Sequence, residues 1–414
     1  MDNILVVDFG SYRVKAGFSS QDEPILMAPS MVGTYQFPNA LTGKMNKDTK
    51  VIGRSIEDQL PLIQLDYPLK STEDETVGIQ WEFYEDIWNY LLNGFDIDIS
   101  SEIVFNAKIH GLPMKSEMKI MELLFEKFGI LGYGCALQTI GLMISTGKFS
   151  GTAVDIGHSS TRIIPFFKGT ILEPSVATIN IGGKHLTEYL GRVLIEDGKF
   201  FQTQDGMFVV NQMKEKCAFA NPLVGVSDLR QFVTNFHKNQ NDNENISIDD
   251  NIDSFLDQQS IADTIETLDG LDPYDFDMPD GGKTRLDAHR YQCVEPLFQP
   301  NIAGVYQQGI HSAIIKSIKS SDLNVRKELY GGIMMYGSTS SIPFLQDRML
   351  AELQKIADPG VKISFVPNIK KDYAVWQGLA NLASNAQTSS IVLKTDFEED
   401  GAESLKSKII NSML

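Results

Sequence analysis

The stretch NILVVDFGSYRVKAGF (3–18) decides the fold of this chain, because the stretch TAVDIGHSSTRIIPFF (152–167) repeats its plan. Each begins with an apolar run that ends in an Asp, and a Gly follows two residues after that Asp. A second apolar run comes after the turn. This pattern predicts a buried strand, a tight glycine turn and a return strand. The two copies indicate the internal duplication of a whole lobe. The corresponding residues are Asp8 and Asp155, Gly10 and Gly157, and Ser11 and His158.

Paired turns of this kind can bind a polyphosphate. A glycine turn between two strands exposes successive backbone N–H groups, which together form an anion site. An Asp at the end of each first strand can hold a hydrated Mg²⁺ ion between the turns, and the metal neutralises the charge of phosphoryl transfer. One such hairpin would be weak evidence, because turns also use Asp and Gly for steric reasons. Two copies predict a clamp around one polyphosphate, built on Asp8 and Asp155.

Composition and charge exclude several classes of function. The 414 residues carry 36 basic and 54 acidic side chains, and the formal net charge is −18. This balance argues against a broad surface for nucleic acid or anionic membrane, which needs clustered positive charge. No apolar run approaches the roughly 18 residues of a transmembrane helix. The three cysteines are too few and too scattered for a disulfide framework or a zinc site, so we expect a reducing compartment.

The negative charge is concentrated in one segment. Residues 221–280 hold 14 acidic and two basic side chains. The polar, Asn-rich stretch 236–250 cannot bury enough apolar surface to offset its ordering entropy, so we expect a disordered surface excursion. The stretch 251–268 has apolar residues at nearly helical spacing. It could be a helix packed on its own domain, a docking helix for a partner protein, or disordered. A longer helical pattern covers 113–129, with Pro at its start and Gly at its end.

The two hairpins resemble the phosphate loops of actin. VVDFGSYRVKAGF is similar to the first loop and VDIGHSSTRIIPFFKG to the second. Further similarity runs along the chain, and only about 222–277 and the tail from about 387 lack a counterpart. The chain is therefore identified as a member of the actin family, an actin-related protein that has diverged from conventional actin. The segments of strongest similarity are PDGGK (279–283), EPLFQPNIAGVYQQGIH (295–311), DLNVRKELYGGIMMYGSTSSIPFLQDRM (322–349) and YAVWQG (373–378).

The resemblance implies an α/β fold with two lobes. Each lobe would have a mixed sheet flanked by helices, and the nucleotide would lie in the cleft between the lobes. The acidic segment, about 222–277, would be a partly disordered insertion in the fourth of four subdomains. Subdomain 1 would comprise 1–29, 68–145 and 374–414, subdomain 2 would comprise 30–67, subdomain 3 would comprise 146–181 and 306–373, and subdomain 4 would comprise 182–305.

The resemblance also implies a site for ATP or ADP with Mg²⁺. Asp8 and Asp155 would hold the Mg²⁺ through water, and Gln138 would position the attacking water. Taken alone, the two acids could merely form strand-end turns, and Gln138 could be an ordinary amide on a helix surface. Lys15 could be a solvated side chain. The other residues at nucleotide-contacting positions are Gly10, Ser11, Tyr12, Lys15, Gly157, His158, Gly183, Lys184, Lys214, Glu215, Gly337 and Thr339.

Departures from the actin pattern put hydrolysis in doubt. Tyr12 replaces a Gly of the first loop, and His158-Ser159 replaces an Asp-Gly pair of the second. The lost Gly restricts a turn that must approach the γ-phosphate. Arg162 stands where actin has a His that orders the catalytic water. An Arg stays charged and cannot act as a base, although it could pair with phosphate. The replaced residues around the base are Ile342, in place of an aromatic residue, and Asp372, in place of a basic one.

Three classes of function remain open. The chain could be a weakly catalytic or non-catalytic subunit of a larger assembly, a filament-forming cytoskeletal ATPase, or another enzyme of the superfamily such as a sugar kinase. For the last of these, the sequence offers no candidate for the base that would activate the acceptor hydroxyl group. Actin subunits join lengthwise when a loop of one subunit enters an apolar cleft of the next. The loop 39–53 keeps the apolar character of that loop. The receiving cleft instead offers Gln377, Asn381 and Asn385, whose spacing puts them on one helical face.

We therefore expect an assembly subunit. Its partners would be actin or another actin-related protein and further subunits of a complex, without direct contact with nucleic acid or membrane. No basic nuclear-localisation run is visible, which favours a cytoplasmic, cytoskeleton-associated location. A nuclear chromatin-remodelling complex and a ciliary assembly are the alternatives.

Overall fold

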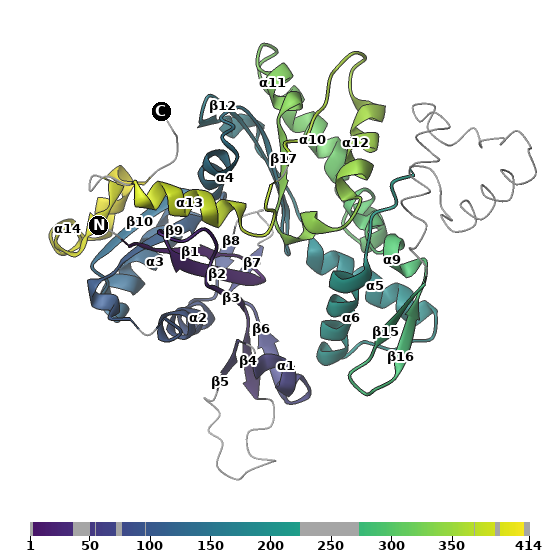
Figure 1. Cartoon of the computed structure of the whole chain (residues 1–414), viewed down its shortest axis with the longest axis horizontal. Helices are drawn as coiled ribbons and strands as arrows, with labels where there is room; N and C mark the ends of the chain where they lie inside the picture. Colours follow the sequence, from purple (N-terminus) through teal and green to yellow (C-terminus); the bar gives the residue numbers. More distant parts are fainter. Residues whose placement is uncertain are drawn as a thin grey trace, which may run out of the picture.

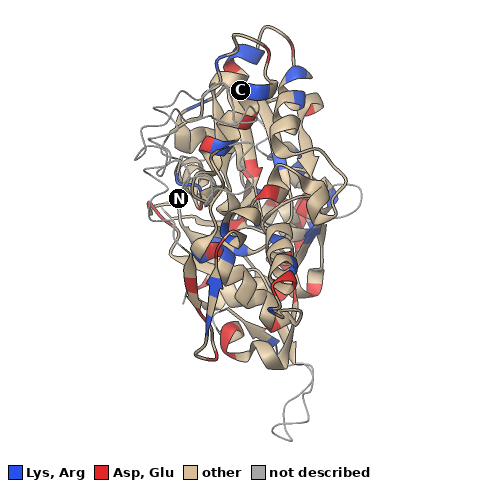
Figure 2. Ribbon diagram, turned by 90° about the vertical axis from the view of Figure 1, so that its right-hand side faces the viewer, with Lys and Arg blue, Asp and Glu red and all other residues tan. Residues whose placement is uncertain are grey.

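The computed structural model describes residues 3–35, 50–53, 55–71, 77–95, 97–223, 273–367, 369–385 and 390–409. These residues form two lobes, each built on a mixed sheet flanked by helices (Figure 1). The expected excursion at 236–250, the expected helix at 251–268 and nearly all of the loop 39–53 lie outside the described residues. Among the residues that are described, no helix is long and apolar enough to cross a membrane. Figure 2 shows acidic and basic residues interspersed along the coloured part of the ribbon.

The first lobe has a six-stranded sheet with the order β18-β10-β9-β1-β2-β3. Its central strands β1, β9 and β10 run parallel and are almost entirely buried, as their continuous apolar sequences require. Helices α2 (Trp81–Asn93) and α3 (Met114–Leu123) supply apolar faces to the core of this lobe. The strands are β1 (Leu5–Phe9), β2 (Arg13–Phe18), β3 (Leu26–Pro29), β9 (Ile103–Lys108), β10 (Gly132–Leu137) and β18 (Val392–Leu393).

The helical pattern predicted at 113–129 is confirmed. After α3 the chain continues as one π-helical turn over Leu124–Phe128 and ends at Gly129, whose φ of 69° lies in the left-handed region that suits glycine. Two further small sheets belong to this lobe. The first contains β4 (Val32–Tyr35), β5 (Lys50–Ile52) and β6 (Ile63–Asp66) beside α1 (Ser55–Gln59), and the second pairs β7 (Leu69–Ser71) with β8 (Val77–Ile79).

The second lobe has a five-stranded sheet with the order β13-β12-β11-β17, and β14 also pairs with β12. Helices α10, α11 and α12 lie beside this sheet, whereas α5, α6 and α9 lie with the hairpin β15–β16 at the far end of the lobe (Figure 1). The strands are β11 (Gly151–Ile156), β12 (Thr161–Phe167), β13 (Thr170–Ile171), β14 (Ala177–Ile179), β15 (Tyr274–Asp277), β16 (Lys283–Leu286) and β17 (Ile333–Tyr336). The helices are α5 (Gly183–Glu196), α6 (Gln204–Cys217), α9 (His289–Gln292), α10 (Ile310–Lys319), α11 (Arg326–Gly331) and α12 (Leu345–Ile356).

The duplicated hairpins are confirmed, and their registers correspond. In the first, β1 pairs antiparallel with β2, and Asp8 lies opposite Lys15. In the second, β11 pairs antiparallel with β12, and Asp155 lies opposite Arg162. The sequence repeat is therefore also a structural repeat, in which each Asp lies opposite a basic side chain on the return strand. The four-subdomain division itself stays a prediction.

Two helices join the lobes where their backbones touch. Helix α4 (Gln138–Thr146) crosses α13 (Ala374–Ser384) at two glycines. A Cβ atom on Gly378 would lie 1.7 Å from the carbonyl oxygen of Gly141, and one on Gly141 would lie 2.5 Å from the carbonyl oxygen of Val375. Because no side chain fits between these backbones, both glycines are needed for the crossing.

Two charged side chains are buried in the cores of the lobes. In the first lobe, Glu117 Oε1 accepts hydrogen bonds from Asn106 Nδ2 (2.9 Å) and Tyr133 Oη (2.6 Å). Burial raises the pKa of the Glu117 carboxyl group above its usual range. In the second lobe, Arg348 donates to both carboxylate oxygens of Glu295, at 2.8 and 3.0 Å.

Candidate functional site

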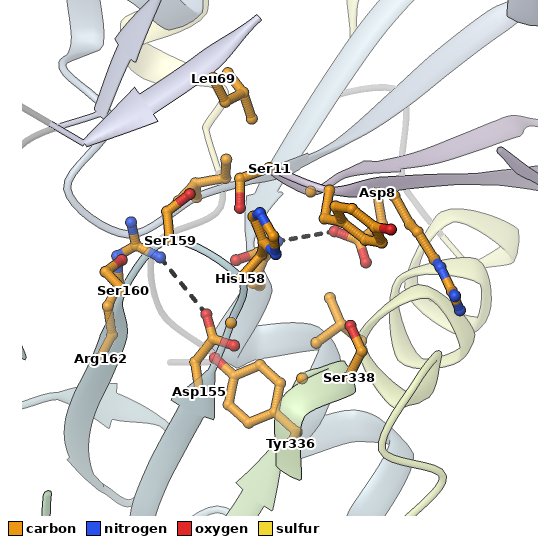
Figure 3. Close-up of a pocket in the computed structure, with 18 of the residues that line it drawn as sticks. Asp8, Ser11, Leu69, Asp155, His158, Ser159, Ser160, Arg162, Tyr336 and Ser338 are labelled. Atoms are coloured by element: carbon orange, nitrogen blue, oxygen red, sulfur yellow. Dashed lines mark hydrogen bonds and ion pairs between the residues drawn. The ribbon is translucent and has the colours of Figure 1, made fainter. Parts of the chain in front are cut away.

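The turns of the two duplicated hairpins line one pocket between the lobes. Its cavity volume is about 90 Å³. In Figure 3, Asp155 and Arg162 face each other on the second hairpin, and His158 extends into the middle of the group. Of the residues predicted from the sequence, those that line this inner pocket are Asp8, Gly10, Ser11, Tyr12, Lys15, Gln138, Asp155, Gly157, His158 and Gly337.

Two carboxylates converge on the floor of the inner pocket. Lys15 Nζ lies 3.0 Å from Asp8 Oδ2, and Gln138 Nε2 donates a 2.8 Å hydrogen bond to Asp8 Oδ1. Asp155 Oδ2 lies 3.6 Å from an Arg162 guanidinium nitrogen. Burial raises the pKa of Asp155 to about 6; Arg162 opposes this shift, and the nearby charge of Asp8 adds to it. A cation between the two carboxylates would relieve this repulsion.

The donor set therefore fits a hydrated Mg²⁺ ion bound with a polyphosphate. Carboxylate oxygens are ligands that Mg²⁺ prefers, and the ion usually keeps several waters and takes its remaining ligands from phosphate. Within the described ranges, no group of three or more His, Cys, Asp or Glu side chains forms a metal cage. Asp8 and Asp155 would hold the ion together with the phosphates, and Lys15 would contribute a positive charge to them.

Glycines shape both turns. Gly10 N donates to Arg13 O at 3.0 Å, and a Cβ atom at Gly10 would lie 2.6 Å from the same oxygen. Gly157 N donates to Ser160 O at 3.1 Å, which closes the second turn in the same way. Gly337 has a φ of 87°, and a Cβ atom there would lie 2.7 Å from Asp155 Oδ1. These positions hold the backbone close to the carboxylates.

Five predicted residues lie around the inner pocket and do not line it. Gly183 N and Thr339 Oγ1 both donate to the carbonyl oxygen of Gly157, at 3.0 and 2.9 Å, so they support the second turn from behind. Lys184 lies on the rim of a neighbouring cavity. The last two belong to α6. Lys214 is buried, which lowers its pKa to about 8, and Glu215 pairs with Arg13 across the cleft at 3.0 Å.

Aromatic rings bridge the two turns. The Tyr12 ring stacks on the His158 ring with 4.5 Å between centroids and 25° between planes, and the Tyr67 ring lies 6.0 Å from His158. Tyr12 Oη accepts a 2.8 Å hydrogen bond from Asn211 Nδ2 on α6. Burial raises the pKa of Tyr12, and burial lowers the pKa of His158 to about 3, so His158 is neutral. Sequence reasoning did not assign Tyr67 and Asn211 to this site.

A second and larger cavity lies on the other side of these rings. This outer cavity has a volume of about 710 Å³. Leu65, Tyr67, Met207 and Phe208 supply apolar surface, and polar groups come mainly from α5 and α6. The residues that line both the inner pocket and the outer cavity are Ser11, Tyr12, Leu69, Lys70, His158 and Ser159.

The departures from the actin pattern occupy definite places. Arg162, for which the sequence left open a contact with phosphate, lies against Asp155 in the structure. Asp372 lines the inner pocket beside Lys371, whose Nζ donates to Ser340 O at 2.9 Å. Ile342 packs against the core of the second lobe. The carboxylate of Asp372 therefore lies at the pocket where the resemblance implies a basic side chain next to the adenine ring.

The fold and the site together define a class: two-lobed α/β proteins with a duplicated strand–turn–strand unit and a pair of carboxylates in the cleft between the lobes. A sequence model of the family described as Actin matches residues 2–410. The chain belongs to the actin family. Membership supports an actin-like nucleotide-binding protein, since proteins of this family typically bind a nucleotide with Mg²⁺. The match extends past residue 387, where the resemblance was expected to end, and β18 from this tail joins the first sheet.

Proposed function

We propose that this protein is a divergent, actin-related member of the family that binds ATP or ADP with Mg²⁺ in the inner pocket. The observation that carries the proposal is the convergence of Asp8 and Asp155, each at the end of a strand that leads into a glycine turn. Lys15, held at 3.0 Å from Asp8, supplies a cation beside the phosphate positions. Bound Mg²⁺ would supply charge neutralisation of the phosphates.

We propose further that hydrolysis is weak or absent. Gln138 donates to Asp8, so its amide is oriented beside the metal position. Arg162 cannot accept a proton, and its guanidinium lies against Asp155. Among the residues of the second hairpin that line the inner pocket, none replaces the His with which actin orders the catalytic water. The His158 ring is stacked on Tyr12 and is not available for this role. The geometry therefore favours holding a nucleotide over cleaving it.

The main role that we propose is that of a structural subunit in a larger assembly. Its partners would be actin or another actin-related protein together with further subunits, in a cytoplasmic, cytoskeleton-associated complex. Gln377 is half-buried and Asn381 is exposed on α13, and Asn385 is exposed directly after the helix, so the polar stripe faces outward. A polar stripe in a receiving cleft would be desolvated by an apolar loop, which disfavours a homopolymer.

Thermal unfolding with and without Mg-ATP tests nucleotide binding. A ligand that binds only the native state stabilises it by about 2.7 kcal/mol at 100 times its Kd. We expect Mg-ATP to raise the Tm of the wild type, and Asp155→Asn to reduce the shift. Asp277→Asn, whose side chain is 82 % exposed on β15, is the matched control and should keep the full shift. No shift in any form with millimolar Mg-ATP would contradict the proposal.

Two measurements separate the alternatives. In single-turnover assays with bound ATP, Arg162→His should raise the rate if this position limits hydrolysis. Sedimentation at high Mg²⁺ and salt tests assembly: regular filaments of the purified wild type would favour a cytoskeletal polymer. Proteins that co-purify with the native chain would distinguish a cytoplasmic complex from a nuclear chromatin-remodelling complex.

A further inference from the structure

Tyr12 connects the two lobes across the cleft. It lies in the turn before β2 of the first lobe, where its ring also packs against the apolar cluster around Ile63, and both its ring and its hydroxyl group reach the second lobe. Its ring stacks on His158 at 4.5 Å, and its hydroxyl oxygen accepts the 2.8 Å hydrogen bond from Asn211. Asn211 is buried. Its Nδ2 also donates to Glu215 Oε1 at 2.9 Å, and its Oδ1 accepts from Lys214 Nζ at 2.8 Å, so both ends of the amide are held.

Further contacts close the same side of the cleft. Arg13, next to Tyr12, pairs with Glu215 of α6. At the start of α6, Gln204 Nε2 donates to the carbonyl oxygen of Leu65 on β6 at 3.2 Å. Helix α6 therefore touches the first lobe near both of its ends and in its middle. All of these contacts are made by the chain itself.

The Tyr12–His158 stack divides the cleft into two spaces. The inner pocket holds the carboxylates but has a volume of only about 90 Å³, whereas the outer cavity has about 710 Å³. Sites that enclose small-molecule ligands usually measure roughly 300–1,000 Å³. The inner pocket is thus too small for a nucleotide in this state, and both rings line the boundary between the two spaces.

We infer that Tyr12, His158 and Asn211 form a clasp that holds the cleft closed, so that a nucleotide reaches Asp8 and Asp155 only when the clasp opens. The clasp is an autoinhibitory contact, and its role toward nucleotide rests on the proposed function. The actin loops that this chain resembles have a Gly at the position of Tyr12 and an Asp at that of His158. In this chain two rings meet at these positions, on the boundary between the inner pocket and the outer cavity.

The strength of the clasp sets the size of the expected effect. A stacked aromatic pair and a hydrogen bond each change an equilibrium by roughly 2- to 12-fold. Tyr12→Ala removes both, so the ratio of open to closed molecules should rise by roughly 5- to 150-fold. Tyr12→Phe keeps the ring and removes only the hydrogen bond, so its effect should lie between those of Ala and the wild type.

Distance measurement between spin labels tests the clasp without any nucleotide. Cys135, Cys217 and Cys293 are all buried, so cysteines introduced at exposed positions can be labelled selectively. Gln64→Cys on β6 and Glu196→Cys on α5 place one label on each lobe. Double electron–electron resonance should show one short distance in the wild-type background and a second, longer distance with Tyr12→Ala. Tyr306→Ala, at a side chain that is 92 % exposed, is the control and should leave the distribution unchanged.

The affinity and association rate of Mg-ATP provide a second test of the clasp. When only a minor open form binds, the apparent affinity falls by the fraction that is open. Tyr12→Ala should therefore tighten apparent binding and speed association by the same factor that the labels report. An unchanged distance distribution in Tyr12→Ala overturns the clasp, whatever nucleotide does. A longer distance without Mg-ATP binding in any variant supports the clasp and overturns the proposed function.

Discussion

Acid should destabilise the protein through His158, and His158→Phe isolates this effect. The imidazole stacks on Tyr12 and lies 6.0 Å from the Tyr67 ring, and burial, aided by the neighbouring cations Lys214 and Lys184, lowers its pKa to about 3. The ordinary pKa of a histidine is about 6.5. Between these values the unfolded chain binds a proton that the folded protein excludes. Stability therefore falls as the pH falls through this window.

The magnitude follows from the two pKa values. At pH 7.5 both states are neutral at His158, and the contribution is close to zero. At pH 5 the unfolded state is protonated while the folded state is not, which favours unfolding by about 2 kcal/mol. Phenylalanine keeps an aromatic ring against Tyr12 and cannot titrate. From pH 7.5 to pH 5 the wild type should thus lose about 2 kcal/mol more than His158→Phe.

Urea unfolding followed by circular dichroism at the two pH values measures this difference. His110, His185, His289 and His311 are present in both proteins, so their titration cancels in the comparison. Any change that Phe makes at pH 7.5 also cancels, because only the change with pH is compared. Equal losses in the two proteins, within about 0.5 kcal/mol, would refute a buried neutral His158.

Three further predictions concern positions outside the clasp. Gly378→Ala would place a methyl group against the carbonyl oxygen of Gly141 and should cost about 3 kcal/mol or more in urea unfolding, whereas Gly331→Ala, where nothing lies within 4 Å, should stay within about 1 kcal/mol of the wild type. Because burial raises the pKa of Glu117, the folded state favours its protonated form, and stability is lost as the pH rises above about 4.5. Glu117→Gln should therefore gain stability relative to the wild type between pH 4 and pH 7 in the same assay, and a constant difference would contradict a raised pKa. Arg348→Ala should lower the free energy of unfolding by about 3 kcal/mol, since it leaves the half-buried carboxylates of Glu295 and Glu352 without their buried partner, and a loss below about 1 kcal/mol would show that the pair is dispensable.

Local patterns predicted much of this structure. The hairpins at 3–18 and 152–167 and the helix that begins at Met114 depend on periodicity and turn residues within short windows, and the structure confirms them. The pocket also unites Asp8 with Asp155, as the repeat implied. These features depend on interactions between residues close in sequence, which a pattern records directly.

The clasp could not be predicted in this way. Its members Tyr12, His158 and Asn211 come from three separate segments, and their contacts depend on how the lobes close. The sequence marked Tyr12 and His158 as departures from small or acidic residues but carried no sign that their rings would stack. The buried Glu117 was missed for a related reason: its place on α3 fits an amphipathic helix, and only the packing of Tyr133 and Asn106 against it reveals its burial.

The matched registers of the two hairpins affect the charge balance of the inner pocket. Lys15 faces Asp8, and Arg162 faces Asp155 at the same place in the second copy. Each half of the molecule thus contributes one acid and one resident counter-ion, and the four formal charges sum to zero before anything binds. An empty pocket with only the two acids would repel itself and would depend on an arriving cation for stability. This chain instead carries a basic side chain opposite each acid, which weakens the repulsion between the two halves whether or not a ligand is present.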